Sequence, residues 1–191
     1  MLISTKMEKT KRKDISEAIE LGDAHVEIHG NVIKISKNGV HLERKIEIPI
    51  KKEGNNLILD AKKATKNIKR NIKTTADHLR NMLAGLDKKY VYKLQICAVH
   101  FPMTTSIKGN EIIIKNFLGE VKDRKATIIE GVSVKVDKEI ITVEGHDKEK
   151  TGQTAANIEN ATRITKRDRR VFQDGIYIIS KEKGVRKAWD F

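Results

Sequence analysis

The chain has 191 residues, which is enough for one medium domain or two small ones. Its formal net charge of +13 favours a polyanionic partner, and nucleic acid is the commonest of these. Aromatic residues make up only 4%, which excludes base stacking as the main source of affinity. One cysteine, Cys97, excludes a disulfide within the chain and fits a reducing compartment. We expect neither a signal peptide nor a membrane span, because no apolar run is long enough.

The first part of the chain carries strand and turn signals. Residues 1–24 are charged and look irregular. From residue 25 onward apolar and polar residues alternate, and Gly30-Asn31 and Asn38-Gly39 predict hairpin turns between short strands. A further alternating run covers residues 46–50, where Pro49 weakens the strand or places it at a sheet edge.

Residues 61–84 form the clearest predicted helix, and Gly85 predicts its end. One stripe at helical spacing is apolar and comprises Ala64, Ile68, Ile72, Leu79 and Leu83. The opposite stripe is basic and comprises Lys62, Lys66, Lys69, Arg70 and Lys73. A basic stripe of this kind is as typical of a solvated face as of a phosphate-binding one.

The second part of the chain repeats the first pattern. After an apolar connector at 90–102, a strand, a Gly-Asn turn and a second strand return in Ile107–Ile114, much as in Ile28–Ile35. A strand at 127–129, a hairpin from residue 132 to 145 and a second helix at about 149–164 follow. One face of that helix is expected to carry Thr151, Ala155, Ile158, Thr162 and Thr165.

This repetition predicts an α+β fold of two tandem duplicated domains, each an antiparallel sheet packed against one helix. We expect a charged N-terminal segment at 1–24 and a first domain at 25–89. A second domain with RNA-binding loops is expected at 90–181, and a basic C-terminal tail at 182–191.

No catalytic constellation stands out. The sequence has no glycine-rich phosphate loop and no Gly-x-Ser-x-Gly elbow. His25 and His29 lie on a predicted strand, where exposed histidines are more common than metal ligands. Cys97 and His100 fall on opposite faces of an extended segment, which argues against a nucleophile and base pair. We therefore expect no enzyme, no catalytic residue, no metal and no cofactor, with a catalytic Asp174 as a minor alternative.

The densest basic cluster lies between the second helix and the last predicted strand. It is opposed only by Asp168 and comprises Arg163, Lys166, Arg167, Arg169 and Arg170. The planar guanidinium group binds phosphate in a bidentate manner, so the cluster favours phosphate contact over a merely solvated loop. In the strand at 176–179 and just before it, Phe172, Ile176 and Ile178 are expected core residues, and Gly175 is expected to serve a turn.

Several motifs resemble one known family, the archaeal and eukaryotic branch of ribosomal protein L-six, called L-nine in eukaryotes. The segment Asp168–Tyr177 resembles the signature near the family's C-terminus. Further matches occur in order at Tyr92-Lys93, His100-Phe101-Pro102, Asn116–Glu120 and Gly152–Glu159. In the first domain, Ser36–Gly39 replaces the family's usual Gly-Pro-basic-Gly turn.

The resemblance implies a structural constituent of the large ribosomal subunit, located in the cytoplasm and without enzymatic activity. It implies binding to rRNA near the sarcin–ricin loop and the stalk base, with other large-subunit proteins and translation factors nearby. Besides the basic cluster, it favours rRNA contacts by Lys115, Asn116, Lys122, Arg124 and Lys125. The basic helix stripe is a weaker candidate. A structured-RNA-binding protein outside the ribosome, or an enzyme of unknown type, would be the alternatives.

Overall fold

The computed structural model describes residues 14–168 and 170–182. Its chain divides into two compact units. Among the described residues, the first unit holds 14–36 and 43–80, and the second holds 37–42 and everything from residue 81 onward. Much of the charged segment expected at 1–24, and almost all of the basic tail expected at 182–191, lie outside the described residues.

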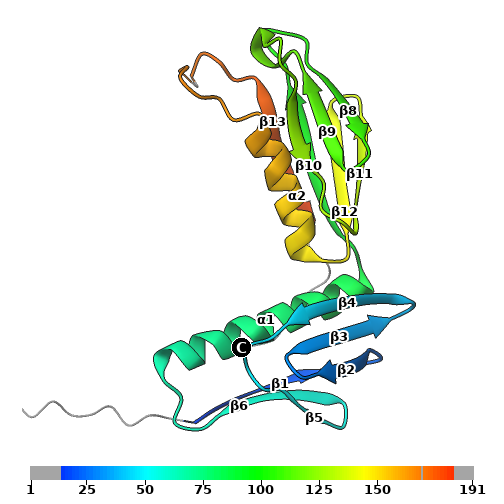
Figure 1. The fold of residues 1–191 in the computed structure, drawn as a ribbon, viewed down its shortest axis with the longest axis vertical. Helices are drawn as coiled ribbons and strands as arrows, with labels where there is room; N and C mark the ends of the chain where they lie inside the picture. Colours follow the sequence, from blue (N-terminus) through cyan, green and yellow to red (C-terminus); the bar gives the residue numbers. More distant parts are fainter. Residues whose placement is uncertain (1–13, 169, 183–191) are drawn as a thin grey trace, which may run out of the picture. The chain divides into compact units, whose positions relative to one another are not determined.

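Within residues 14–87 the structure describes six short strands and one long helix (Figure 1). The strands are β1 (Ile15–Glu20), β2 (His25–His29), β3 (Val32–Lys37), β4 (Val40–Lys45), β5 (Lys51–Glu53) and β6 (Asn56–Ala61). The helix is α1 (Lys66–Asp87). The strands form two sheets, with the orders β1-β6-β5 and β2-β3-β4.

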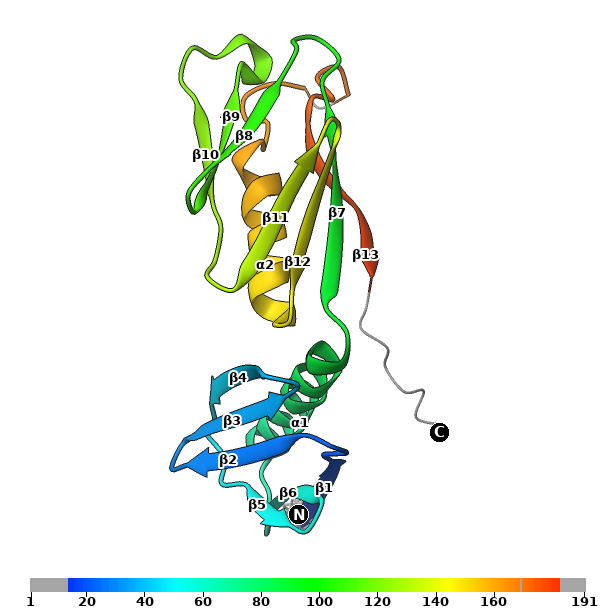
Figure 2. The same cartoon turned by 90° about the vertical axis from the view of Figure 1, so that its right-hand side faces the viewer.

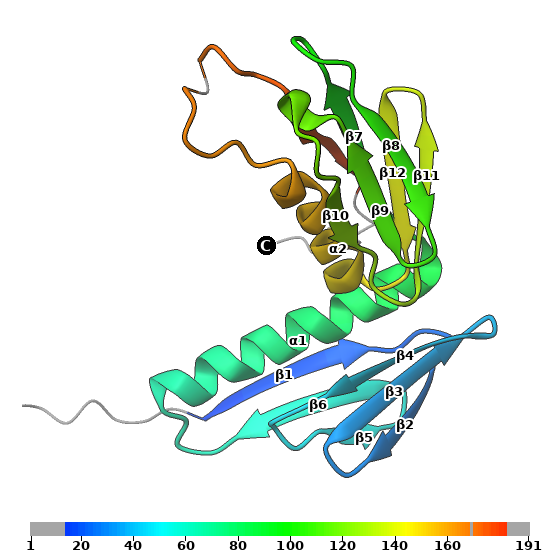
Figure 3. The ribbon, with the colours of Figure 1, turned by 45° about the horizontal axis from the view of Figure 1, so that its top comes forward.

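Alternation along the strands buries one face of these sheets. Ile33 and Ile35 of β3 are fully buried, as are Leu57 and Leu59 of β6, while the residues between them stay partly exposed. In α1 the buried side chains recur at helical spacing and include Ile72, Ala76 and Leu79. An ion pair of 2.9 Å joins Arg80 of α1 to Glu17 of β1, and α1 runs along that strand (Figure 3).

The described residues from 90 to 182 form seven strands, a single 3₁₀ turn and one helix (Figure 2). The strands are β7 (Tyr90–Cys97), β8 (Thr104–Lys108), β9 (Glu111–Lys115), β10 (Arg124–Thr127), β11 (Val132–Asp137), β12 (Ile140–Gly145) and β13 (Gly175–Glu182). The 3₁₀ turn is η1 (Phe117–Gly119), and the helix is α2 (Lys148–Ala161). Two sheets result, with the orders β11-β12-β7-β13 and β10-β9-β8.

One apolar core connects both of these sheets with α2. Its fully buried members include Leu94 on β7, Ile112 on β9, Ile141 on β12 and Ile158 on α2. Each such side chain stabilises the fold by about 1.5–3 kcal/mol. The residue before the helix, Asp147, is its N-cap, and its carboxylate accepts hydrogen bonds from the backbone N–H groups of the first turn.

The α+β class with one helix in each half is confirmed, as are the two Gly-Asn hairpins. Gly30-Asn31 joins β2 to β3, and Gly109-Asn110 joins β8 to β9. The two glycines have φ values of 58° and 60°, which a residue without Cβ adopts most easily. The strands of each half form two sheets, however, where we expected one.

Two strands lie where we expected irregular chain, and one expected strand is wrong. Residues 15–20 form β1, because the inward-facing Glu17 is compensated by Arg80. Residues 90–97 form β7, which pairs with β12 and β13 and carries apolar residues on both of its faces. Residues 46–50 form no strand: the buried Ile46 donates its N–H to the Asn31 carbonyl, and Pro49 has no N–H to donate.

The expected helix boundaries also need correction. α1 begins five residues later than predicted, because β6 continues to Ala61, and it passes through Gly85 to end at Asp87. Gly85 is needed for space, since a Cβ there would overlap the backbone oxygen of His146, another residue of the second unit. Ile68 is exposed and Leu83 only half-buried, so the apolar stripe is narrower than expected.

The later boundaries shift as well. α2 ends at Ala161, which leaves Thr165 exposed beyond the helix. The strand expected at 127–129 is β10, and only Thr127 belongs to it. Ile176 is fully buried, and both Phe172 and Ile178 pack against the core as half-buried side chains, which confirms all three as core residues.

Candidate nucleic-acid interface

Three connecting segments of the second unit meet at one end of its sheets. They are residues 98–103 between β7 and β8, 116–123 between β9 and β10, and 162–174 between α2 and β13; we call them together the loop end. Figures 1 and 2 both show these connections on the same side of the unit. The side-chain amide of Asn116 donates a hydrogen bond of 3.0 Å to the Pro102 carbonyl, which joins the first two segments.

Asp174 joins the first segment to the third. This residue is 2% exposed, and its side chain accepts hydrogen bonds from the backbone N–H groups of Val99, at 2.7 Å, and His100, at 2.9 Å. Its second oxygen accepts a hydrogen bond from the His100 ring Nδ1. Burial by itself raises the pKa of Asp174, but the hydrogen bonds from His100 and Val99 outweigh it, and the pKa is lowered. The carboxylate therefore holds two loops together in its ionised form.

The ring of Phe172 lies beside the side chains of His100 and Arg167 at the loop end. Its ring is 5.1 Å from the His100 ring, and the Arg167 guanidinium carbon lies 4.9 Å from its centre. Because the Phe172 side chain also packs on the apolar core, the third segment is anchored at both Phe172 and Asp174. The cations carried by this segment are thus displayed from a supported loop.

Arg124 at the start of β10 is used inside the fold. Its guanidinium makes two hydrogen bonds, of 2.7 and 2.8 Å, to the carboxylate of Glu120. It also donates to the carbonyl oxygens of Ala161 and Arg163, where α2 ends, and lies 4.2 Å over the ring of Phe117. These hydrogen bonds satisfy carbonyl groups that a helix leaves unpaired at its C-terminus.

The negative charge of Glu120 is balanced by the same contacts with Arg124. Its hydrogen bond from Arg124 lowers its pKa more than burial raises it, and the charges of Arg124 and Arg167 lower it further. Glu120 thus stays ionised and partnered, and its negative charge at the loop end is balanced.

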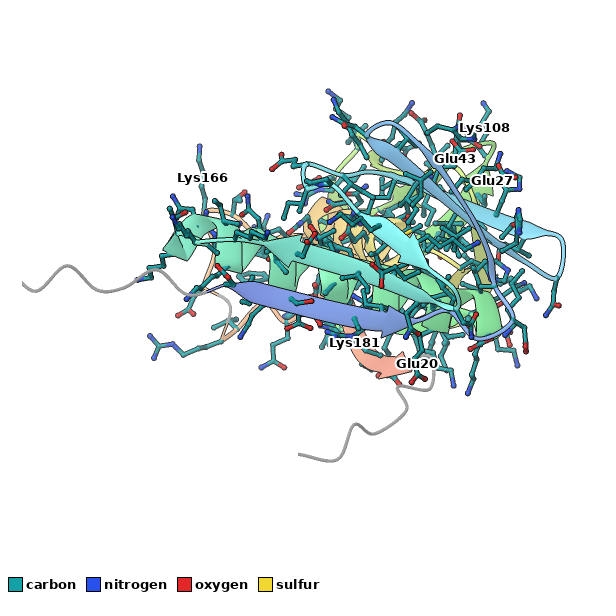
Figure 4. All side chains as sticks on the ribbon, turned by 90° about the horizontal axis from the view of Figure 1, so that it is seen from below. Glu20, Glu27, Glu43, Lys108, Lys166 and Lys181 are labelled. Carbon is teal, nitrogen blue, oxygen red and sulfur yellow. The ribbon has the colours of Figure 1, made fainter. Side chains whose placement is uncertain are left out.

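The remaining cations of the loop end face solvent. Arg163, Lys166, Arg167 and Lys122 are exposed, and among residues 14–168 and 170–182 none of them forms an ion pair with a carboxylate. Arg170 is 92% exposed, with its Nε 3.6 Å from an oxygen of Asp168. Figure 4 shows the side chain of Lys166 extending away from the ribbon. Arg169 lies outside the described residues.

Three further residues predicted as contacts have partners in the fold. Lys125 pairs with Glu111 at 3.1 Å, Lys115 lies 4.0 Å from Asp123, and the Asn116 amide is used by Pro102. The exposed cations of the third segment and Lys122 are therefore better candidates than these residues and Arg124.

A shallow pocket of about 300 Å³ opens beside Arg163. It is lined by Glu159, Asn160, Thr162, Arg163, Ile164 and Tyr177. The Thr162 hydroxyl at its base accepts the backbone N–H of Ile176, and Glu159 accepts that of Ile178. The carboxylate of Glu159 in this lining disfavours phosphate in the pocket.

The basic stripe of α1 also faces solvent in the first unit. Lys66, Arg70 and Lys73 are exposed, Lys69 is half-buried, and Lys62 lies in the turn before the helix. The first turn of α1 has no acidic residue to complement the helix dipole. This stripe stays a weaker candidate for anion contact.

The described part of the chain contains no cluster of three or more His, Cys, Asp or Glu side chains that could hold a metal ion. His25 and His29 are exposed on β2, each near Glu27. No helix among the described residues is long and apolar enough to cross a membrane. Gly175 is the first residue of β13 and lies under the Tyr177 ring, so the expected turn there is wrong.

Comparison with known proteins gives consistent matches. The family model described as ribosomal protein L6 matches residues 101–175. The large ribosomal subunit protein uL6 of Methanococcus vannielii is 43% identical over 171 residues, which cover 87% of this chain and 94% of that protein. The protein of the same name from Sulfurisphaera tokodaii is 42% identical over 177 residues, covering 90% and 95% of the two chains.

The chain belongs to the ribosomal protein uL6 family.

Membership in the uL6 family confirms the resemblance found in the sequence and the expectation that the chain is not an enzyme. The residues that match the L6 family model include most of the loop end. Sequence reasoning found the cations of that region but missed the pairing of His100 with Asp174. The signal for it was weak: His100 stands in one matching motif and Asp174 in another, 74 positions apart.

Proposed function

We propose that the chain is a structural constituent of the large ribosomal subunit, in the cytoplasm, and that its loop end binds rRNA. We further propose a place near the sarcin–ricin loop and the stalk base, beside other large-subunit proteins and the docking site of translation factors. The uL6 names of the relatives support the subunit, and the resemblance supports the finer location.

The observation that carries the proposal is that acidic side chains at the loop end are buried or paired, whereas most of its cations are exposed. The acidic side chains described there are buried, as Asp174 is, or lie beside a cation, as Glu120, Asp123 and Asp168 do. Exposed guanidinium and ammonium groups on a fixed loop neutralise phosphates and release counterions, so binding is expected to weaken steeply with salt. Few exposed aromatic rings accompany them, which favours contacts with the backbone of folded RNA over base stacking.

The test is a salt titration of binding to transcribed large-subunit rRNA of Methanococcus vannielii. Replacing Arg163, Lys166 and Arg167 together with alanine is expected to lower the slope of log affinity against log salt by about two to three units, because each phosphate that is no longer neutralised lowers it by roughly one. These three side chains are exposed, so the variant should fold normally, which circular dichroism checks.

The matched control removes three exposed lysines of the second unit that lie away from the loop end, namely Lys108, Lys150 and Lys181. In Figure 4, Lys108 and Lys181 leave the ribbon at places well separated from Lys166. The control loses the same net charge and should keep the wild-type slope. Equal slopes for both variants and the wild type would reject the loop end as the binding surface.

Sedimentation of tagged chain through a sucrose gradient tests the ribosomal part of the proposal. The wild-type protein should travel with large subunits, and the triple variant should be depleted from them. Recovery of the wild-type protein only near the top of the gradient would favour an RNA-binding role outside the ribosome.

A further inference from the structure

The most exposed apolar side chains of the described residues lie at the loop end. Val121 is fully exposed, Val99 is 71% exposed and Val171 is 60% exposed, and no other large hydrophobic residue among those described exceeds 53%. Each of the three segments contributes one of them. Single exposed apolar residues are ordinary on a protein surface, but the three highest values falling on three adjoining loops need a reason.

The three valines are held in place by the loops that carry them. Asp174 accepts a hydrogen bond from the backbone N–H of Val99 itself. Val121 follows η1, where Asn116 and Leu118 take left-handed backbone conformations with φ of 57° and 52°. Val171 precedes Phe172, which packs on the core. The hydrogen bond to Asp174, the left-handed turn at η1 and the packed ring of Phe172 therefore fix loops whose tips are apolar and uncovered.

We propose that Val99, Val121 and Val171 pack directly against rRNA, on the riboses and base edges of a helix minor groove. This inference rests on the proposed function and specifies how the loop end binds. The A-form minor groove is wide and shallow, so short apolar side chains reach its surface without unstacking bases.

Charge complementarity favours RNA as the occupant, because two of the valines are next to a cation in the chain. Lys122 follows Val121 and Arg170 precedes Val171, and both cations are exposed. A protein partner would need acidic side chains facing these cations, whereas the phosphates that flank a minor groove supply negative charge on both sides.

The valines give the interface a component that charges cannot supply. Phosphate contacts weaken with salt through counterion release, while burial of apolar surface is not weakened by it. The two contributions can therefore be separated by the same titration that tests the proposed function.

The experiment compares the double variant Val121→Ala and Val171→Ala with the wild type on the Methanococcus vannielii rRNA transcript. Affinity should fall about ten-fold at every salt concentration, with the slope unchanged, because several methyl groups no longer touch the RNA. The control, Ile107→Ala with Ile179→Ala, removes exposed apolar surface from β8 and β13 outside the loop end. It should bind like the wild type.

Three outcomes would overturn the inference. If the valine variant binds as tightly as the control, the inference is rejected. The proposed function still stands in that case, provided the wild type binds with a steep salt slope. A reduced slope in the valine variant also overturns the inference, since the cations would then have been displaced. Normal RNA binding with poor recovery in large subunits would assign the valines to a protein neighbour and reject RNA as their partner.

Discussion

Replacing Asp174 with alanine is expected to lower the free energy of unfolding by about 3–5 kcal/mol. The change removes the buried carboxylate and leaves the backbone N–H groups of Val99 and His100 without their acceptor. It also releases the His100 ring. Urea denaturation followed by circular dichroism measures the destabilisation, and faster amide hydrogen exchange at Val99 and His100 would locate it.

Asp137→Ala is the matched control for this prediction. Asp137 ends β11 with an exposed side chain, so its removal should change the free energy of unfolding by less than about 0.5 kcal/mol. If Asp174→Ala unfolded at the same urea concentration as this control, the carboxylate would not be what joins the two loops.

The pH dependence of this effect has a defined direction. The pKa of Asp174 is lower in the folded chain than its ordinary value of 3.8. Its ionised form therefore stabilises the fold above pH 3.8, and that stabilisation disappears as the pH falls from there toward the folded-state pKa. The difference in unfolding free energy between wild type and Asp174→Asn should stay constant above pH 3.8 and shrink as the pH falls below that value.

Replacing Arg124 with alanine is expected to cost about 2–3 kcal/mol of stability while leaving the salt slope of RNA binding unchanged. The variant lacks the paired hydrogen bonds to Glu120, the bonds to the two carbonyls at the end of α2, and the interaction with the Phe117 ring. Arg124→Lys should restore less than half of this stability, because one ammonium cannot reach all these acceptors.

Two comparisons sharpen this prediction. Lys125→Ala, on the next residue of β10, removes an exposed ion pair and should cost less than about 1 kcal/mol. A double-mutant cycle with Glu120→Gln measures the part that passes through the ion pair. A salt slope lower by about one unit in Arg124→Ala would instead mean that Arg124 contacts a phosphate.

Local signals in the sequence were sufficient for much of the fold. Gly30 and Gly109 sit where the hairpins need positive φ, and helical spacing found both helices. β1 was missed because Glu17 faces inward, which hides the alternation of that strand, and only the distant Arg80 makes this arrangement stable. β7 was missed because apolar residues stand on both of its faces, which hides the alternation of its buried side chains. Both errors concern side chains whose burial depends on distant parts of the chain.

The site shows the same limit. The basic cluster from Arg163 to Arg170 was visible because its members are neighbours in sequence. Composition could not distinguish Arg124, which is bound within the fold, from Arg163, which is exposed. The distinction depends on where α2 ends relative to β10, and that is a property of packing rather than of residue type.

The position of β13 in its sheet has a consequence for synthesis of the protein. β7 lies between β12 and β13, and β13 is the last strand of the sheet to leave the translating ribosome. Until then β7 offers an open edge, and the core lacks Ile176. The first six strands can acquire their native pairing earlier. A nascent chain stalled before residue 175 should thus be a chaperone substrate in its later half, with protease resistance limited to its earlier half.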